Sequence, residues 1–138
     1  MPISVTVRQV MEPVVAIDSN QTVSQAIEKM LQTGAFSLLV ERQGLPVGVI
    51  TDRDILRRCV AVGRFPDKVR VEEIMSSPII TIEPEVRAGE ALRMMIDKDV
   101  RRLYVVEKGK VIGRVTHTGL SKSLLDVLIA LNDVRQQL

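Results

Sequence analysis

The feature that most limits the fold of this chain is an internal duplication. Apolar, glycine and threonine positions of the first half recur in the second half at a constant spacing, which is lengthened once, by an insertion near Ser77. The matched pairs are Val7 and Val71, Val10 and Ile74, Met11 and Met75, Pro13 and Pro78, Ile17 and Ile82, Ala26 and Ala91, Met30 and Met95, Leu38 and Leu103, Val40 and Val105, Gly44 and Gly109, Gly48 and Gly113, and Thr51 and Thr116. Because the matches keep one register across a whole half, the chain holds two copies of one unit. Each copy is too small to bury its sheet and helices alone, so we expect the two to cover each other about a pseudo-two-fold axis.

The hydrophobic periodicity of each copy predicts the order strand, helix, strand, strand, helix. In the first copy, strands are expected over 14–17, 37–41 and 46–51, and helices over 22–34 and 52–62. Thr22 and Gln25 form a capping box, and Gly34 fits the stop of the first helix. Ahead of the first strand, Thr6 is expected to cap a single helical turn. The second helix is expected to present one apolar face, made of Ile55, Leu56, Cys59 and Val60.

The last helix, over 120–138, is longer than its counterpart in the first copy. We divide the chain into repeat 1 (5–62), a linker (63–70), repeat 2 (71–128) and a C-terminal helix extension (129–138). An apolar stripe runs along the helix through Leu120, Leu124, Val127, Leu128, Leu131 and Val134. Its surplus turns indicate a partner helix, most simply from a second copy in a homodimer. A tail that packs on its own repeat is the alternative.

Composition narrows the possible partners. The net charge of +2 argues neither for nor against nucleic-acid binding. With one tyrosine, two phenylalanines and no tryptophan, the chain has few aromatic rings on which the bases of single-stranded nucleic acid could stack. No run approaches the ~18 apolar residues of a membrane span, and no signal pattern opens the chain, so we expect a cytoplasmic protein. Cys59 is alone, which excludes an internal disulfide and a Cys-rich zinc site. A small buried helix residue is the favoured interpretation, with an intermolecular disulfide as the alternative.

The chemically most informative stretch runs from Gly48 to Asp54, where a strand hands over to a helix. Backbone N–H groups at a helix N-terminus favour phosphate oxygens, and the Thr51 hydroxyl can add a hydrogen bond. Asp54, one turn into the helix, can accept hydrogen bonds from the two vicinal hydroxyls of a ribose. Equally, Thr51 or Asp52 can simply cap the helix, with Asp54 favouring its positive end. The residues alone leave both interpretations open.

The duplicated pattern Met…Pro…Ala-x-x-x-Met…Gly-x-x-Thr, followed by Asp54 in the first copy and Gly119 in the second, resembles a tandem pair of CBS (cystathionine-β-synthase) domains. The resemblance covers about 5–127. It implies an α+β fold of two β-α-β-β-α repeats packed with pseudo-two-fold symmetry. Many such pairs bind adenine nucleotides between their repeats and act as energy or ligand sensors, and the isolated module is not an enzyme.

The resemblance also implies a site. Asp54 matches the ribose-binding aspartate of the family. The nucleotide-binding residues carried over are Val49, Thr51, Arg53, Asp54, Met75, Ile80, Val100, Arg101 and Arg102. The apolar members suit an adenine ring, and an arginine fork suits phosphate. Because neighbours on a strand point to opposite faces, one of the two adjacent arginines is expected to reach the ligand, and we favour Arg101. Arg53 can equally be a solvated helix residue.

A second, symmetry-related site would combine Arg114, Thr116, Thr118 and Gly119 with Met11, Val15, Ala35, Phe36 and Ser37. Gly119 offers no ribose acceptor, and Phe36-Ser37 replaces the paired arginines. We therefore expect this site to be empty or much weaker. His117, the single histidine, has no partner cluster in the sequence, which favours a helix cap or surface group over a metal ligand.

The function expected from these residues is a non-catalytic regulatory module, with no cofactor required. A mono- or diphosphate is preferred to a Mg²⁺-bound triphosphate, because no carboxylate cluster for Mg²⁺ is evident. AMP is the favoured ligand, with ADP or ATP as the other nucleotides considered. The alternatives are a CBS protein that binds S-adenosylmethionine or nucleic acid. An enzyme is disfavoured, because the sequence has no Ser-His-Asp order, Cys-His pair, Walker loop or metal-ligand spacing. The regulated protein partner is unidentified.

Overall fold

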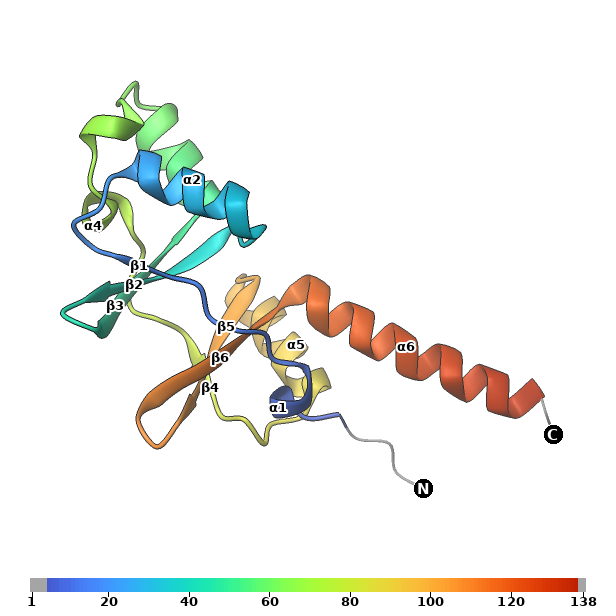
Figure 1. Ribbon diagram of the computed structural model, residues 1–138. Coiled ribbons are helices and arrows are strands. Elements are labelled where there is room, and N and C mark those ends of the chain that lie inside the picture. Colours follow the sequence, from blue (N-terminus) through green and yellow to red (C-terminus); the bar gives the residue numbers. More distant parts are fainter. Residues whose placement is uncertain (1–4, 137–138) are drawn as a thin grey trace. The chain divides into compact units, whose positions relative to one another are not determined.

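The computed structural model describes residues 5–136. It confirms a mixed α+β architecture with two three-stranded sheets, drawn in Figure 1. The chain divides into two compact units. The β1–β3 unit is Val14–Ile79, and the β4–β6 unit consists of the described residues within Met1–Pro13 and Ile80–Leu138. Each is described by itself below.

The β1–β3 unit folds a sheet of order β1-β2-β3, with β1 parallel and β3 antiparallel to β2. Its elements are β1 (Ala16–Asp18), α2 (Val23–Thr33), β2 (Ser37–Arg42), β3 (Leu45–Thr51), α3 (Asp52–Ile55), a π-helix (Leu56–Val60), a 3-10 helix (Pro66–Lys68) and α4 (Val71–Ile74). The predicted capping box is confirmed, because the Thr22 hydroxyl accepts from the N–H of Gln25 at 3.2 Å and Gln25 Oε1 accepts from that of Thr22 at 2.8 Å. Gly34 ends α2 with φ +73°, where a glycine is unstrained.

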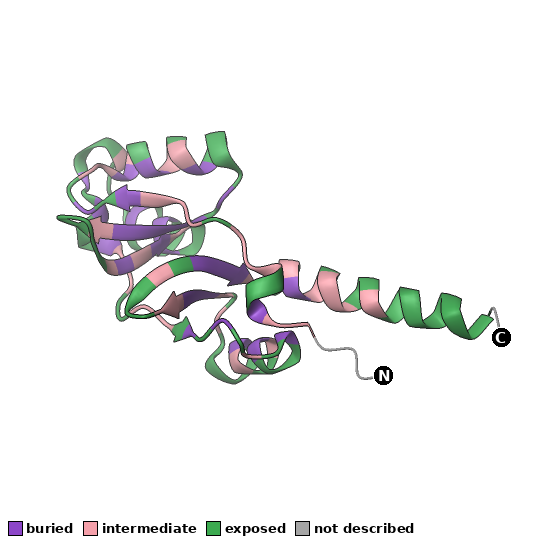
Figure 2. Cartoon of the chain, turned by 60° about the horizontal axis from the view of Figure 1, so that its bottom comes forward, coloured by how far each residue is buried: buried purple, intermediate pink, exposed green. Residues whose placement is uncertain are grey.

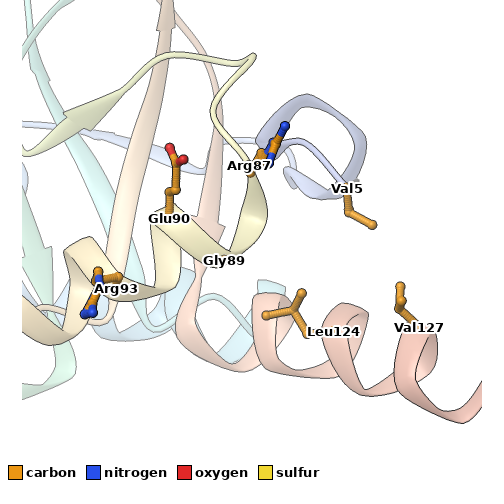
Figure 3. A pocket seen from close by; sticks show the side chains of 7 residues that line it. All are labelled: Val5, Arg87, Gly89, Glu90, Arg93, Leu124 and Val127. Carbon is orange, nitrogen blue, oxygen red and sulfur yellow. The ribbon is translucent and has the colours of Figure 1, made fainter. Parts of the chain in front are cut away.

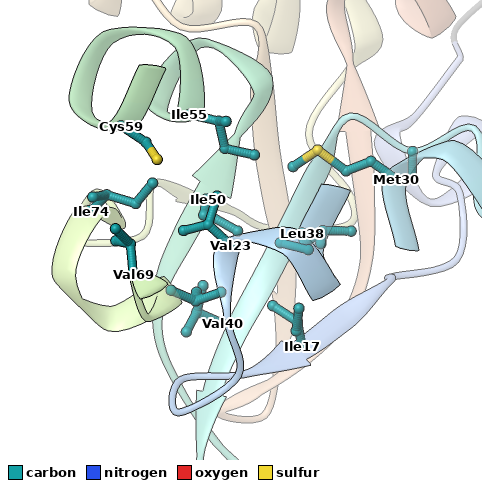
Figure 4. Close-up of a cluster of buried hydrophobic side chains, with 13 residues drawn as sticks. Ile17, Val23, Met30, Leu38, Val40, Ile50, Ile55, Cys59, Val69 and Ile74 are labelled. Atoms are coloured by element: carbon teal, nitrogen blue, oxygen red, sulfur yellow. The ribbon is translucent and has the colours of Figure 1, made fainter. Parts of the chain in front are cut away.

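One face of this sheet and its helices bury a single apolar cluster. Figure 4 shows Leu38, Val40 and Ile50 of the strands packed in one cluster with Val23 and Met30 of α2 and with side chains of the following helices. The Cys59 thiol lies fully buried in this cluster. The interpretation of Cys59 as a small core residue is therefore confirmed.

Two expectations for this unit need correction. The first strand begins at Ala16 and not at Val14. The predicted helix over 52–62 is one turn of α-helix followed by a π-helix that ends at Val60. Leu56 and Val60 remain 60% and 53% exposed. Of the predicted apolar face, only Ile55 and Cys59 contact the core. The unit has one apolar cluster, and it lies on their side of the helical segment.

The β4–β6 unit repeats this plan. Its elements are α1 (Val7–Val10), β4 (Thr81–Ile82), α5 (Ala88–Lys98), β5 (Arg102–Glu107), β6 (Lys110–Thr116) and α6 (His117–Gln136). The sheet order is β4-β5-β6, again with one parallel and one antiparallel pair. The short α1 confirms the single turn expected after Thr6, whose N–H donates to Gln9 Oε1 at 2.9 Å.

The short first helix of each sequence copy packs in the unit formed by the other copy. The helix α1, from the first copy, lies in the β4–β6 unit, and α4, from the second copy, lies in the β1–β3 unit. Val7 of α1 is buried with Leu103 and Leu120, and its N–H donates to Val86 O at 2.8 Å. Likewise Val71 of α4 is buried in the β1–β3 unit, and its N–H donates to Gln21 O at 2.8 Å. Each short turn thus satisfies backbone groups ahead of the other copy's first helix.

The C-terminal helix α6 begins at His117, before the Leu120 that was expected to open it. Leu120 is buried and Leu124 packs partly on the core. Further along, α6 is exposed, as the green ribbon in Figure 2 makes visible. The large exposed apolar side chains of this part are Leu125, Leu128, Ile129, Leu131 and Val134. The predicted end at Leu138 lies outside the described residues.

Candidate functional site

The end of β3 and the start of α3 form a reciprocal cap between Thr51 and Asp54. Thr51 has extended backbone angles (φ −120°, ψ 164°), and helical geometry starts at Asp52. The Thr51 hydroxyl accepts from the N–H of Asp54 at 3.1 Å, and Asp54 Oδ2 accepts from the N–H of Thr51 at 3.0 Å. These bonds satisfy donors that a helix start leaves unpaired. The capping role considered for Thr51 is thus present.

Asp54 has a further partner that the sequence did not reveal. Its Oδ1 accepts a hydrogen bond from the hydroxyl of Ser76 at 3.0 Å, and the residue is only 9% exposed. Ser76 reaches this place because its backbone pairs with that of Val49 in both directions, at 2.9 and 2.8 Å. A carboxylate has about four lone-pair sites, so each oxygen of Asp54 can still accept another hydrogen bond. The cap therefore uses only part of the acceptor capacity of Asp54.

The residues around Asp54 combine apolar and charged groups. Val49 is half-buried on β3, and Met75 packs partly on the apolar cluster. Arg58 donates to the carbonyl oxygens of Ile74 and Met75 at 3.1 Å each, which holds the backbone that carries Met75. Arg53 is exposed, in line with a solvated helix residue. Of the predicted nucleotide-binding residues, Val49, Thr51, Arg53, Asp54 and Met75 thus belong to the β1–β3 unit.

The other predicted residues lie in the β4–β6 unit, around the start of β5. Ile80 and Val100 pack partly on the core of that unit. Arg101 is exposed and Arg102, the first residue of β5, is half-buried. The carbonyl oxygen of Arg101 accepts from the N–H of His117 at 2.8 Å, which ties this turn to the start of α6.

The end of β6 is the counterpart of the end of β3, with different side chains. The Thr116 hydroxyl accepts from the N–H of Gly119 at 3.0 Å, so the threonine caps α6 as Thr51 caps α3. Opposite them, Glu12 pairs with Arg114 through both backbone groups, at 2.7 and 2.9 Å, and through an ion pair at 3.5 Å. His117 is exposed, and no cluster of three His, Cys, Asp or Glu suited to a metal ion occurs within 5–136.

Comparison with known protein families decides the identity of the two repeats. A model of the CBS domain matches residues 7–61 and, a second time, residues 71–126. The chain belongs to the CBS-domain family. Tandem CBS domains generally act as regulatory nucleotide-binding modules, and stand-alone CBS-domain proteins are typically regulatory rather than catalytic.

Individual CBS proteins resemble the chain over most of its length. An uncharacterized protein of Methanopyrus kandleri is 40% identical over 98 residues, which cover 70% of this chain and 50% of that protein. The CBS domain-containing protein YhcV of Bacillus subtilis is 32% identical over 102 residues, 74% of this chain and 72% of YhcV. A solved structure of a protein with CBS domains from Burkholderia ambifaria has 31% identity and a TM-score of 0.85, covering 88% of this chain and 95% of that one. The chain spans about half the length of the M. kandleri relative.

A pocket of the β4–β6 unit lies apart from both strand ends. It has a volume of about 430 Å³ and lies in the β4–β6 unit between α5, α6 and Val5. Figure 3 shows Arg87 and Arg93 of the α5 region on one side and Leu124 and Val127 of α6 on the other. None of the predicted nucleotide-binding residues lines it.

Within 5–136, the structure contains no helix with the length and apolarity of a membrane span.

Proposed function

We propose that this chain is a non-catalytic CBS regulatory module that binds an adenine nucleotide, with AMP as the favoured ligand, at the strand end carrying Thr51 and Asp54. The observation that carries the proposal is the buried Asp54 carboxylate, held by the Thr51 N–H and the Ser76 hydroxyl. Two hydrogen bonds fix its orientation, and its remaining lone pairs match the two vicinal hydroxyls of a ribose. Such a bond is stronger in a buried place than in water.

The neighbouring groups support a nucleotide over a bare sugar. The Thr51 hydroxyl accepts from the N–H of Asp54 and keeps its own proton, which a phosphate oxygen can accept. Val49 and Met75 are both partly exposed apolar residues beside this cap, and they suit the face of an adenine ring.

The proposal assigns four further residues to the same function on the strength of the family resemblance. Ile80 and Val100 add apolar surface, and Arg101 or Arg102 adds a guanidinium for phosphate. Arg101 is favoured of the two, since it is exposed and Arg102 is half-buried. A mono- or diphosphate suits this set better than a Mg²⁺-bound triphosphate, because no carboxylate cluster for Mg²⁺ accompanies it among residues 5–136.

We also propose that the module works as a homodimer through α6 and transmits ligand binding to a protein partner. The support is the row of exposed apolar side chains beyond Leu124, which a monomer leaves in water. Ligand binding can then shift a packing equilibrium only by the difference in affinity between its two states.

The test is calorimetric titration of AMP into the wild-type protein and into Asp54→Asn. The variant keeps the size of the side chain and removes the charge, and we expect at least a tenfold loss of affinity. Thr116→Ala is the matched control at the other strand end and is expected to bind as wild type does. Unchanged binding by Asp54→Asn would contradict the site assignment.

Thermal unfolding with different ligands tests the choice of AMP, since a ligand at 100 times its Kd adds about 2.7 kcal/mol of stability. Stronger stabilisation by S-adenosylmethionine than by AMP would overturn AMP as the favoured ligand. A salt-sensitive RNA complex would favour nucleic acid.

A further inference from the structure

Each of the two strand ends carries one carboxylate, but at a different position of the repeat. In the β1–β3 unit the helix residue Asp54 carries the acid, and the residue opposite it is the short Ser76. In the β4–β6 unit the repeat register places Gly119 at the helix position of Asp54 and Glu12 at the position of Ser76. The sequence comparison of the repeats shows a lost aspartate. The structure shows that the β4–β6 unit carries an acid, Glu12, on the opposite side of the corresponding strand end.

The Glu12 carboxylate lies where a side chain of residue 119 would point. A β-carbon built on Gly119 would be 3.2 Å from Glu12 Oε1 and 3.0 Å from the Thr116 hydroxyl oxygen. An aspartate at 119 would therefore place its carboxylate against that of Glu12. By contrast, Asp54 faces a hydroxyl, which donates a hydrogen bond to it.

Arg114 holds Glu12 in this place. The repeats align Arg114 with Val49, so a guanidinium replaces an apolar side chain at this strand end. Arg114 is 8% exposed, and its Nη2 lies 3.5 Å from Glu12 Oε2. The backbone pair between the two residues fixes both side chains at the same level of the strand. An ion pair between the buried Arg114 and the partly exposed Glu12 thus stands where the other unit has a valine and a serine.

We propose that Glu12 and Gly119 form a selectivity pair, in which the Glu12–Arg114 ion pair fills the second strand end and keeps nucleotides out of it. The nucleotide part of this proposal rests on the function proposed above. Glu12 Oε1 lies against the position that a side chain at 119 would take, and its other carboxylate oxygen is paired with Arg114 rather than with a ligand hydroxyl. The second site is closed by a residue that is present, in addition to the aspartate that is missing.

The first test needs no ligand. Gly119→Asp is compared in the wild-type background and in a Glu12→Ser background by thermal unfolding. With Glu12 present, two carboxylates meet, and we expect Tm to fall by about 5 °C. In the Glu12→Ser background, the new carboxylate can accept from the serine hydroxyl and from the N–H of Thr116, as Asp54 does from its partners, so Tm is expected to stay or rise. Gly119→Ala adds the β-carbon without the charge and is the matched control in both backgrounds. An equal effect of Gly119→Asp in both backgrounds would contradict the inference that Glu12 lies where a carboxylate at position 119 would be.

The second test counts nucleotide sites. Calorimetry is expected to give one AMP per wild-type chain and two for the variant that combines Glu12→Ser, Arg114→Val and Gly119→Asp. Each single variant is expected to keep one. A folded triple variant that still binds one AMP would contradict the selectivity role. Failure of the wild type to bind AMP would instead contradict the proposed function, and the unfolding comparison would still decide whether Glu12 holds the place of the missing acid.

Discussion

A β-carbon on Gly48 would lie 2.8 Å from the carbonyl oxygen of Ser76. The same atom would lie 2.8 Å from Met75 Sδ, so β3 and the segment of Met75 approach each other to a distance that only glycine permits. This approach allows the backbone pair between Val49 and Ser76, and with it the hydrogen bond from Ser76 to Asp54. The geometry of the candidate site therefore depends on Gly48, which is not among the predicted nucleotide-binding residues.

Gly48→Ala is expected to destabilise the protein. The methyl group meets a backbone oxygen that cannot move without breaking the Val49 pair, and overpacking of this kind costs about 1–3 kcal/mol. Chemical unfolding measures the change. Gly89→Ala in α5 is the matched control, because nothing lies within 4 Å of its added β-carbon. Alanine in this first turn of the helix is expected to leave stability unchanged or to raise it by up to about 1 kcal/mol. Equal effects of the two substitutions would contradict the close approach at Gly48.

Glu73 is expected to make stability depend on pH in the acid range. The backbone N–H of Arg70 and the guanidinium of Arg64, both at 2.6 Å, lower the pKa of Glu73 below its ordinary value of 4.5. A carboxyl whose pKa is lower in the folded protein stabilises it above the unfolded pKa, and this contribution is lost as pH falls through the folded pKa. Glu73→Gln should therefore be less stable than wild type at pH 7.

Unfolding curves of Glu73→Gln and wild type, recorded from pH 7 down to acid, are expected to converge as Glu73 becomes protonated. Glu72→Gln is the neighbouring control, since its ion pair with Arg42 is longer, at 3.3 Å, than the 2.6 Å pair of Glu73 with Arg64. A difference between Glu73→Gln and wild type that persists unchanged into strong acid would show that lost packing, and not the charge, destabilises the variant.

The exposed part of α6 is expected to mediate self-association. Leu128 lies among its exposed apolar side chains, at 62% exposure. Leu128→Lys places a charge in this surface and should convert a dimer to a monomer in analytical ultracentrifugation. Ala130→Lys is the control, since Ala130 shares the opposite helix face with Asp126 and Asp133. A wild-type protein that sediments as a monomer at micromolar concentration would overturn the proposed homodimer.

Much of the fold followed from residues close together in the chain. The capping box of Thr22 and Gln25, the stop at Gly34 and the hairpin around Gly44 depend on neighbours a few residues away, so their patterns are visible in the sequence. The duplication extended these predictions to the second copy. Where local periodicity was misleading, as at Leu56 and Val60, the core offered by the unit decided which side chains were buried.

The candidate site divides in the same way. The sequence by itself determined that Thr51 and Asp54 stand at a strand end and that Gly119 lacks the acid, because these are facts of position within a repeat. The tertiary structure decided that Ser76 lies against Asp54 and Glu12 against Gly119. Those partners are far apart along the chain and meet only through the backbone pairs of Val49 with Ser76 and of Arg114 with Glu12. Such pairs form between segments whose register is set by the packing of a whole unit, and no local pattern of residues encodes it.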